Sequence, residues 1–502
     1  MTSDIVYVWA WPAGSTTPVP AGVLRPGARG LYFRYGRGWL NRPDAFALGP
    51  DLPLRDEDFA PSGDLRMPGS IRDAAPDTWG RRVISDRVLG DPNRDPNTVD
   101  PQVFLLESGS NRLGAIDFQA SVDRYVARDD DASLDDLQRA ADAIAAGEIL
   151  PPQLAAAAQH GTTMGGARPK ATISDSTGDW IAKFSTSADS YDVIHAEAMG
   201  VALARRAGID VPQFRLVRSL GRDVLLTRRF DRGPGGTRRA VVSGLTMLGL
   251  DDTGFSQGSY PELLDVIRTA SADPARVGED LFRRVAFNIA IRNGDDHLRN
   301  HAAFWDGEHL DLTPAYDLSP RPVSGDTDAQ AIAYSRAGER ASNFATLARA
   351  AADYGLTTRR ARHIINTVVD TIVDEWDDAA DEAELSNANR ARFQGWLFLN
   401  RGTFYGYSPA DPAATPRVAI GAPPKDPAAP LPDRAERPGR SQFDFRRYTD
   451  DTVTTCDDVD IFDTREHFGL GFTAIERIVD TGTSGAYLDD LGQLRIPRSS
   501  LT

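Results

Sequence analysis

The sequence predicts an α+β protein in which strand-rich parts precede a helix-rich part. Three observations support this prediction. Residues 1 to about 125 consist mainly of short extended pieces, broken by Gly, Pro and Asn turns. Between residues 155 and 230 the pattern changes to a Gly-rich turn, a strand, a helix and a pair of strands. From about residue 260 to 405, apolar residues recur mostly at helical spacing.

The composition fits a folded protein larger than one typical domain. The chain has 502 residues, 41% of them apolar and 8% aromatic, which is enough for one large core or two. Its formal net charge of −16 argues against direct, charge-driven binding to nucleic acid. One cysteine, Cys456, allows neither an internal disulfide nor a zinc site built from cysteines. Because the first residues lack a signal-peptide pattern and no apolar run reaches ~18 residues, we expect a cytoplasmic protein without a membrane segment.

Strands and helices are both predicted in the first 150 residues. The extended pieces are IVYVWAW, GLYFRYG and AFAL. The stretch 68–90 predicts a helix that starts near Asp77 and stops at Gly90. Ser133 is predicted to cap a second helix, because Asp136 lies three residues on and apolar residues then recur at helical spacing.

The middle of the chain predicts a Gly-rich turn followed by a strand, a helix and two strands. The turn is TTMGGARPK, residues 162–170, and the strand is DWIAKFS. The stretch 192–208 predicts a helix that ends at Gly208. The stretch 214–230 predicts two strands joined around Gly221.

The remaining chain divides into a helical part, a linker and a tail. One predicted helix, VGEDLFRRVAFNIAIRN, has apolar residues four positions apart: Val277, Leu281, Val285 and Ile289. Nine prolines between residues 409 and 438 predict an extended linker. The tail, 442–502, has enough apolar residues for a small appendage, and its pattern assigns no role.

A polar cluster, RNGDDHLRN, follows this helix at residues 292–300. A carboxylate is costly to remove from water, so a cluster beside a core helix must be solvated, paired or metal-bound. Asn300 follows Asp295 by five positions, the spacing of the protein-kinase catalytic loop. In that chemistry the Asp accepts the proton of the acceptor hydroxyl and the Asn binds magnesium. A second magnesium-binding carboxylate should follow, and Asp317 in LTPAYDLSP supplies it.

Phosphoryl transfer also needs groups that hold the triphosphate, and candidates precede the polar cluster in the expected order. Lys183 in WIAKF is a strand lysine. Glu197 lies 14 residues later on the predicted helix, a spacing that lets its carboxylate reach the ammonium group. Gly165 and Gly166 allow the backbone to approach a phosphate closely. The ordered set, more than any one residue, predicts a phosphotransferase.

Simpler structural interpretations exist for each of these features. The polar cluster alone fits a solvated turn between a helix and a strand, and Lys183 fits an edge-strand charge. Glu197 fits a solvated helix face, Asp317 a turn cap, and the Gly-rich turn a hairpin. Independent surface residues have no reason to fall into this particular order, so the conjunction favours the functional interpretation.

Two other metal chemistries also compete for the cluster. His297 and His301 are four apart and would face one zinc ion on a helix, but HLRNH lacks the internal glutamate of a zinc protease. A magnesium-dependent nuclease could use Asp295, Asp296 and Asp317. That interpretation leaves the strand lysine, the helix glutamate and the Gly-rich turn without a role.

Over roughly residues 5 to 405 the chain resembles the HipA-type serine/threonine kinase toxins of bacterial toxin–antitoxin pairs. FRYGRGWLNRPDAFALGPDLPL and PGSIRDAAPDTWGRR resemble the N-terminal subdomain of that family. Its kinase segment is matched in order by TTMGGARPKATI, WIAKF, HAEAMGVALARRAGIDVP, RRFDR, NGDDHLRNHAAF and PAYDLSP.

The resemblance implies a two-lobe, protein-kinase-like fold, with a β-rich N-lobe, an N-terminal subdomain and an all-helical C-lobe. The implied parts are the N-terminal subdomain (1–125), the N-lobe (126–235), the C-lobe (236–405), a Pro-rich linker (406–441) and a C-terminal extension of unknown role (442–502).

The resemblance further implies ATP and Mg²⁺ as cofactors and assigns roles to individual residues. Asp295 would be the catalytic aspartate, and Asn300 and Asp317 would hold magnesium. Lys183 would grip the phosphates while Glu197 orients it. The implied ATP-binding residues are Thr163, Gly165, Gly166, Lys170, Lys183, Thr227, Arg228, Arg229 and Phe230, the last four forming a strand edge beside adenine.

Regulation, substrate and partner also follow only from the resemblance. Family members autophosphorylate a serine of the Gly-rich loop, which switches the kinase off; here the aligned residue is Thr163, with Thr162 adjacent. Family toxins phosphorylate an aminoacyl-tRNA synthetase and bind a helix-turn-helix antitoxin, so DNA would be contacted only through that partner. A catalytically degenerate fold that serves as an antitoxin-binding co-repressor is the alternative, which the filled catalytic positions disfavour.

Overall fold

The computed structural model describes most of residues 5–407 and three short strands beyond them. Within 5–407 it leaves out 90–94, 96–97, 129–131, 147, 149–150, 152, 155–156, 158–167, 187–188 and 272. The three later strands are β13 (Asp458–Asp460), β14 (Tyr487–Leu488) and β15 (Leu494–Pro497), paired antiparallel in the order β13-β15-β14. The predicted Pro-rich linker lies outside the described residues.

The N-terminal part is built on a five-stranded antiparallel sheet with the order β4-β3-β2-β1-β5. Its strands are β1 (Val6–Ala10), β2 (Val19–Gly27), β3 (Gly30–Tyr35), β4 (Asp58–Phe59) and β5 (Ile116–Gln119). Fully buried side chains such as Val8, Leu24 and Phe33 form its core. The strands predicted from IVYVWAW and GLYFRYG are confirmed. The one predicted from AFAL is wrong, because the amide of Leu48 hydrogen-bonds to the Tyr35 hydroxyl at 2.8 Å instead of to a neighbouring strand.

Four helices accompany this sheet: α1 (Arg37–Leu40), α2 (Gly69–Arg72), α3 (Thr78–Leu89) and α4 (Pro101–Glu107). The predicted helix after Asp77 is α3, whose first turn includes a hydrogen bond from the Arg81 amide to the Asp77 carbonyl at 2.7 Å. The stretch 68–77 before α3 forms a short helix and a Pro-containing turn and does not extend α3.

The middle part is a four-stranded antiparallel sheet with the order β6-β7-β9-β8. Its strands are β6 (Lys170–Asp175), β7 (Gly178–Phe184), β8 (Phe214–Ser219) and β9 (Arg222–Arg228), and helices α5 (Leu134–Ala146) and α7 (Val193–Arg206) pack on it. The predicted cap of α5 is present, since the Asp136 amide donates to Ser133 Oγ at 3.1 Å. Gly208 and Gly221 follow α7 and β8 with φ of 77° and 78°, as a helix stop and a tight turn require.

Strand alternation decides where Lys183 points. Its neighbours Ala182 and Phe184 pack with α5, together with Val224 and Leu226 of β9. Successive side chains of a strand point to opposite faces, so Lys183 lies on the face that carries α7. Leu225 of β9 is buried on that same face, in the core that α7 shares with the C-lobe.

The C-terminal part of 5–407 is mainly helical. It contains α8 (Gly244–Met247), α9 (Tyr260–Ala270), α10 (Pro274–Ala290), α11 (Phe344–Arg349), α12 (Thr358–Asp374), α13 (Trp376–Glu382) and α14 (Asn387–Phe393). Short 3₁₀ turns lie at Pro234–Gly236, Leu298–Asn300, Ala350–Tyr354 and Arg401–Phe404. The predicted apolar face of α10 is buried in the core at Val277, Leu281, Val285 and Ile289.

The resemblance implied an all-helical C-lobe, but the observed C-lobe is not purely helical. It also holds a three-stranded antiparallel sheet of β10 (Ala240–Ser243), β11 (Ala302–Trp305) and β12 (Leu310–Leu312). The hairpin β11–β12 follows the polar cluster, and β10 pairs with β11 from about 60 residues upstream.

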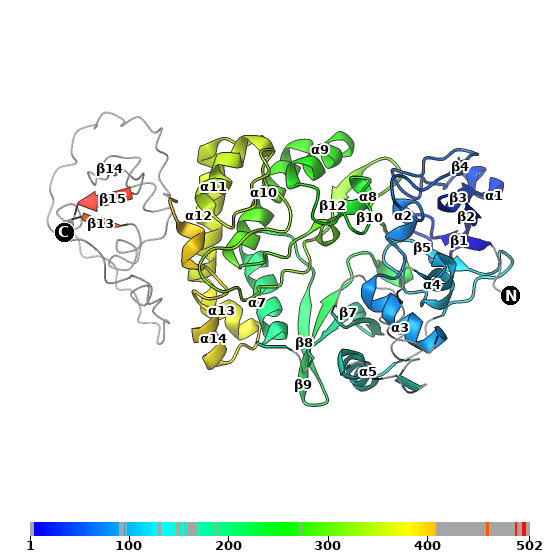
Figure 1. Ribbon diagram of the computed structural model, residues 1–502, viewed down its shortest axis with the longest axis horizontal. Coiled ribbons are helices and arrows are strands. Elements are labelled where there is room, and N and C mark those ends of the chain that lie inside the picture. Colours follow the sequence, from blue (N-terminus) through cyan, green and yellow to red (C-terminus); the bar gives the residue numbers. More distant parts are fainter. Residues whose placement is uncertain are drawn as a thin grey trace.

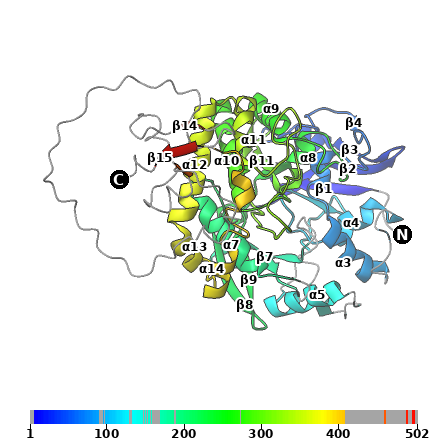
Figure 2. The same cartoon turned by 60° about the vertical axis from the view of Figure 1, so that its left-hand side comes forward.

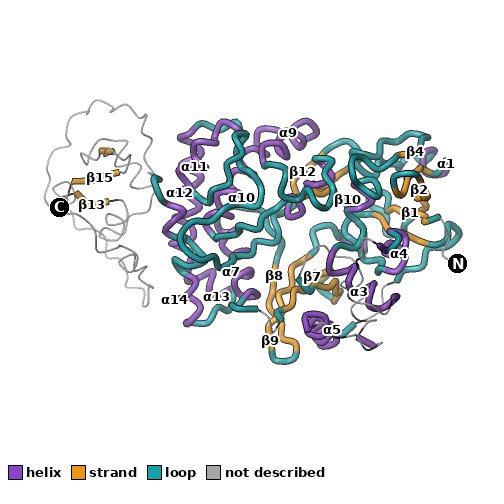
Figure 3. The backbone as a smooth tube through the Cα atoms, in the orientation of Figure 1, coloured by secondary structure: helices purple, strands orange, loops and turns teal. Residues whose placement is uncertain are grey.

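The parts form an elongated arrangement. Figure 1 shows the N-terminal sheet at one end, the helices α9 to α14 toward the other, and the four-stranded sheet below and between them. A second view keeps α7 between that sheet and the helices α12 and α13 (Figure 2). Figure 3 shows helix concentrated in the C-lobe and strand in the other two parts. Among the described residues, no helix is long and apolar enough to cross a membrane.

Among the polar contacts that attach the N-terminal part to the rest, those around Asp73 and Asp231 form two junctions. At the first, the Asp73 carboxylate accepts from the Ser243 amide and hydroxyl, both at 2.7 Å, and from Thr246 Oγ1 at 2.9 Å. At the second, the buried Asp231 carboxylate accepts from the Arg229 and Arg232 guanidinium groups, both at 2.8 Å, and from the Gly114 amide at 2.8 Å. Both junctions are close to chain segments that lead into the candidate site.

Candidate active site

Lys183 lies at the centre of the site and contacts two carboxylates. Its ammonium group donates to Glu197 Oε1 and, at 2.5 Å, to Asp317 Oδ1. Glu197 is buried on α7, and its helix begins at Asp192, which accepts from the His195 amide at 3.3 Å as an N-cap. The helix glutamate, 14 positions after the lysine, and the aspartate, 134 positions after it, therefore both contact its ammonium group.

The electrostatics keep Lys183 and Asp317 charged. Burial alone would lower the pKa of Lys183, but the Asp317 and Glu197 carboxylates outweigh it and raise the pKa well above its usual value. Burial likewise favours the neutral form of Asp317, yet the ammonium groups of Lys183 and Lys170 hold its pKa well below the usual range. The site thus presents fixed charges at neutral pH.

Asp317 has an unusual backbone and a closely packed neighbour. Its φ is 59°, in the left-handed region that non-glycine residues seldom adopt, and its carbonyl accepts from Asn293 Nδ2 at 3.2 Å. A Cβ at Gly200 of α7 would stand 2.4 Å from the carbonyl oxygen of Leu318. Only glycine therefore lets α7 approach the Asp317 segment this closely. Gly200 was not among the predicted site residues, although a glycine inside a well-formed predicted helix is a signal for close packing.

The two adjacent aspartates of the polar cluster have opposite orientations. Asp295 is exposed, whereas Asp296 is buried and accepts from Asn288 Nδ2 at 2.7 Å, from His301 Nε2 at 2.8 Å and from the Tyr260 hydroxyl. A buried carboxylate with three donors is a structural anchor. Asp296 thus fixes the loop, and its neighbour faces solvent.

Hydrogen bonds join this loop to the Asp317 segment. The Tyr316 hydroxyl donates to the Arg299 carbonyl at 2.7 Å, and Asn300 Nδ2 donates to the Asp295 carbonyl at 3.4 Å. Asn300 and Asp317 thus lie on two loops that are tied together. One carboxylate and one amide oxygen fit Mg²⁺, which takes few protein ligands and completes its shell with water and phosphate.

The competing metal chemistries find less support. Asp296 is buried and its Oδ2 already accepts from three donors, which disfavours the nuclease arrangement. His301 pairs with Asp296, while the His297 ring packs edge-on against Phe255 with centroids 5.3 Å apart. Within the part of the chain that the structure describes, no group of three or more His, Cys, Asp or Glu is arranged to hold a metal ion.

The strand predicted to flank adenine differs from the prediction in its place in the sheet. Thr227 pairs with Ile181 on one side and Phe214 on the other, so β9 is a central strand and not an edge. Arg229, predicted as an ATP-binding residue, has its guanidinium buried against Asp231, the Asn111 side chain and the Arg112 carbonyl, so this side chain is engaged within the protein.

The other predicted ATP-binding residues are distributed as follows. Arg228 ends β9 and is exposed, and the Phe230 ring lies 5.7 Å from that of Tyr316, beside Asp317. Lys170 lies directly opposite Lys183 in the β6–β7 register. Burial and the like charge of Lys183 lower the pKa of Lys170. Thr162, Thr163, Gly165 and Gly166 lie outside the described residues.

A small β-lobe carries a strand lysine in contact with a helix glutamate, and a helical lobe carries the polar loop. This arrangement defines a protein-kinase-like fold. Residues 162–376 match the family model of the HipA-like C-terminal domain, which agrees with the resemblance seen in the sequence over that part of the chain.

The chain is also similar to three individual proteins. A protein of Sinorhizobium fredii named "Putative kinase Y4dM" is 31% identical over 175 residues, which cover 32% of this chain and 42% of that protein. The chain thus spans about two fifths of that relative. A chain of the Shewanella oneidensis MR-1 toxin–antitoxin complex of HipA, HipB and operator DNA has the same fold, with a TM-score of 0.56, 18% identity, and coverage of 77% of this chain and 93% of that one. The Helicobacter pylori proinflammatory kinase CtkA gives a TM-score of 0.37 at 13% identity, over 46% of this chain and 86% of that one.

Proposed function

We propose that this chain is an ATP- and magnesium-dependent protein serine/threonine kinase. The observation that supports it most is the single Lys183 ammonium group in contact with both Glu197 and Asp317. A buried, permanently charged cation beside a magnesium-type carboxylate is what holding a triphosphate requires.

The proposed mechanism divides the work among residues of this chain. The exposed Asp295 accepts the proton of the acceptor hydroxyl. Lys183, oriented by Glu197, and Lys170 across the β6–β7 pair hold the phosphates. Asn300 and Asp317 would hold Mg²⁺, which when bound neutralises charge that develops on the transferred phosphoryl group. The buried Asp296 keeps the loop in place for these roles.

We further propose a biological setting as the toxin of a toxin–antitoxin pair. A helix-turn-helix antitoxin would restrain the kinase and contact DNA for it, which agrees with the net charge of −16 on this chain. The protein substrate would be a cytoplasmic translation protein such as an aminoacyl-tRNA synthetase. Autophosphorylation at Thr163, with Thr162 beside it, would regulate the enzyme.

The test is transfer of label from ATP. Purified wild-type protein with Mg²⁺ should label itself or a protein of a cell extract, and Asp295→Asn should lose at least about 100-fold of the rate. Asp311→Asn, at an exposed position of β12 in the same lobe, is the matched control and should keep the wild-type rate. Equal rates for wild type and Asp295→Asn would refute the assignment. A fold without catalysis, the co-repressor alternative, would show neither transfer nor thermal stabilisation by Mg²⁺ and ATP.

A further inference from the structure

A group of guanidinium side chains adjoins the polar loop and has no role in the mechanism above. The Asp252 carboxylate faces Arg299 at 3.0 Å, Arg81 at 3.6 Å and Arg72 at 3.8 Å. Arg72 and Arg81 come from α2 and α3 of the N-terminal part, and Arg299 from the loop itself. We call these four residues the Asp252 cluster. It brings three cations from two parts of the molecule to one carboxylate.

Two guanidinium groups of the Asp252 cluster are partly exposed to solvent. Arg72 has a second carboxylate, Asp73, at 3.3 Å and is nearly buried, whereas the Arg81 and Arg299 side chains keep 24% and 28% of their surface exposed. The approaches of Arg81 and Arg72 to Asp252 are longer than hydrogen bonds, so the group is not closed. Burial lowers the pKa of Arg81, and the Asp252 and Asp77 carboxylates do not make up the loss. A further anion at this place would therefore be stabilised.

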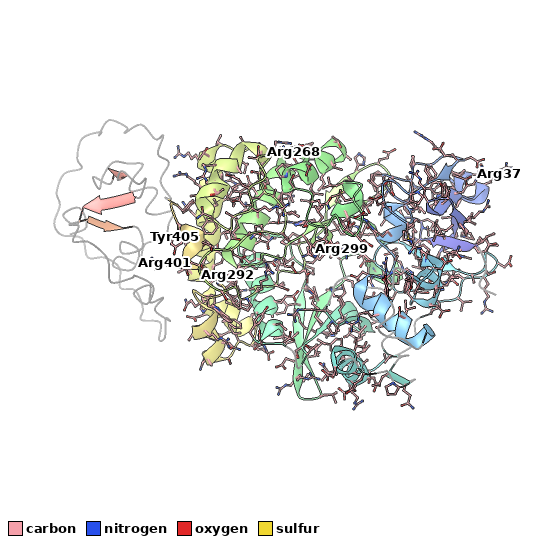
Figure 4. All side chains as sticks on the ribbon, viewed as in Figure 1. Arg37, Arg268, Arg292, Arg299, Arg401 and Tyr405 are labelled. Carbon is pink, nitrogen blue, oxygen red and sulfur yellow. The ribbon has the colours of Figure 1, made fainter. Side chains whose placement is uncertain are left out.

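The Asp252 cluster includes Arg299, a residue of the loop that carries Asp295. Arg299 directly precedes Asn300, and its guanidinium also donates to the Asp252 carbonyl at 3.2 Å. Figure 4 labels Arg299 near the middle of the molecule, between the C-lobe helices and the N-terminal part. Phe255 lies three residues after Asp252 and is 38% exposed. Its ring packs on that of His297, which follows Asp295 by two positions. A charged and an aromatic group thus adjoin the loop of Asp295.

We propose that the Asp252 cluster is a specificity subsite that binds an Asp or Glu side chain close to the acceptor residue of the protein substrate. This inference rests on the proposed kinase activity of the same site. A substrate carboxylate between Arg81 and Arg299 would gain short, forked hydrogen bonds, whereas the Asp252 carboxylate approaches Arg299 at 3.0 Å and Arg81 only at 3.6 Å. Nucleotide phosphates are not the ligand, because the sheet lysines Lys183 and Lys170 serve them.

The test compares acceptor peptides that differ in one neighbouring residue. A peptide library with one Ser acceptor carries Glu, Gln, Lys or phosphoserine at each flanking position, and kcat and KM are measured with labelled ATP. Wild type should favour Glu over Gln about 10-fold at one position, through KM. Arg81→Gln should bring this ratio close to one, and Arg82→Gln, the exposed neighbour in α3, should leave it unchanged. Asp252→Asn removes the competing carboxylate and should raise the ratio about threefold.

The opposite signs for Arg81→Gln and Asp252→Asn separate a subsite from a structural clamp. A clamp predicts that both variants lower kcat equally on the Glu and Gln peptides, and that result would overturn the proposal, as would a wild type without a Glu preference. A preference for phosphoserine over Glu would assign the subsite to phosphate instead and overturn the carboxylate assignment.

Binding of the peptide gives a readout that does not depend on phosphoryl transfer. Fluorescence anisotropy with a labelled Ser-Glu peptide should give a Kd about 5- to 10-fold weaker for Arg81→Gln than for wild type and Arg82→Gln. Equal Kd values for all three proteins overturn the subsite even if Mg²⁺ and ATP bind. Absence of ATP binding with an intact difference in peptide Kd would refute the kinase proposal alone.

Discussion

Two groups of charged side chains, around Asp231 and around Lys183, are built from the same chemistry and differ in what they leave open. At Asp231, two arginines and a backbone amide saturate a carboxylate that is almost fully buried. At Lys183, one ammonium group contacts two carboxylates, but a third of the Asp317 side chain remains exposed. The saturated group has nothing left to bind and joins two parts of the fold. The open one keeps a charged oxygen for a ligand.

The largest expected effect breaks the open group. Lys183→Met removes the preorganised cation, so label transfer at saturating ATP should fall by about 100- to 1,000-fold. Stability should also fall, because the buried Glu197 carboxylate loses its cation, although Asp317 can turn to solvent. Rates of label transfer and urea denaturation on the same preparation measure both. Transfer within a factor of three of wild type would remove Lys183 from the chemistry.

The second prediction breaks the saturated group. Asp231→Ala leaves the Arg229 and Arg232 guanidinium groups buried without their carboxylate, so the free energy of unfolding should fall by about 3–5 kcal/mol. Urea denaturation measures this loss. If Asp231→Ala unfolds at the same urea concentration as wild type, the junction does not contribute the stability assigned to it.

A third prediction concerns how α7 positions the open group. Gly200→Ala places a methyl group 2.4 Å from the Leu318 carbonyl, which should cost about 1–3 kcal/mol of stability and displace Asp317, lowering the transfer rate. Gly38→Ala, at a helical glycine with nothing within 4 Å of the added carbon, should be neutral or slightly stabilising and is the control. Equal behaviour of the two variants would show that α7 has room to move.

The smallest expected effect is a dependence on pH at the start of α7. The Asp192 carboxylate accepts a hydrogen bond from His195 Nδ1 at 2.7 Å. This hydrogen bond raises the pKa of His195. A raised folded-state pKa means that the stabilisation is complete below about pH 6.5 and is lost as the pH rises through the folded value. Between pH 6 and 8, wild type should lose on the order of 1 kcal/mol more than His195→Gln, as measured by urea denaturation at each pH. An identical pH profile for both proteins would contradict this.

Much of the candidate site could be predicted because its residues follow one another in a fixed order. The helix glutamate and the strand lysine are near in sequence, and strand alternation and helix spacing fix the faces on which they lie. Asp317 could be anticipated from its type and place, but its 2.5 Å contact with Lys183 depends on tertiary packing.

What could not be predicted depends on partners distant in the chain. Asp295 and Asp296 are chemically identical neighbours, and only Tyr260, Asn288 and His301 decide which one is buried. The strand β10 has only four residues and forms by pairing with β11, about 60 residues later. A local hydrophobic pattern therefore does not predict it. Arg229 follows a strand as a ligand-binding residue would, yet Asn111 and Arg112 of the N-terminal part engage it.

The most direct test of the account is the affinity for Mg²⁺ and ATP, measured by calorimetric titration of wild type and Asp317→Asn. The open carboxylate should make binding dependent on magnesium, and the Kd of Asp317→Asn should be weaker by at least about 10-fold, the equivalent of 1.4 kcal/mol. The same Kd for both proteins, or no binding to wild type, would contradict the claim that the Lys183 group is a nucleotide site.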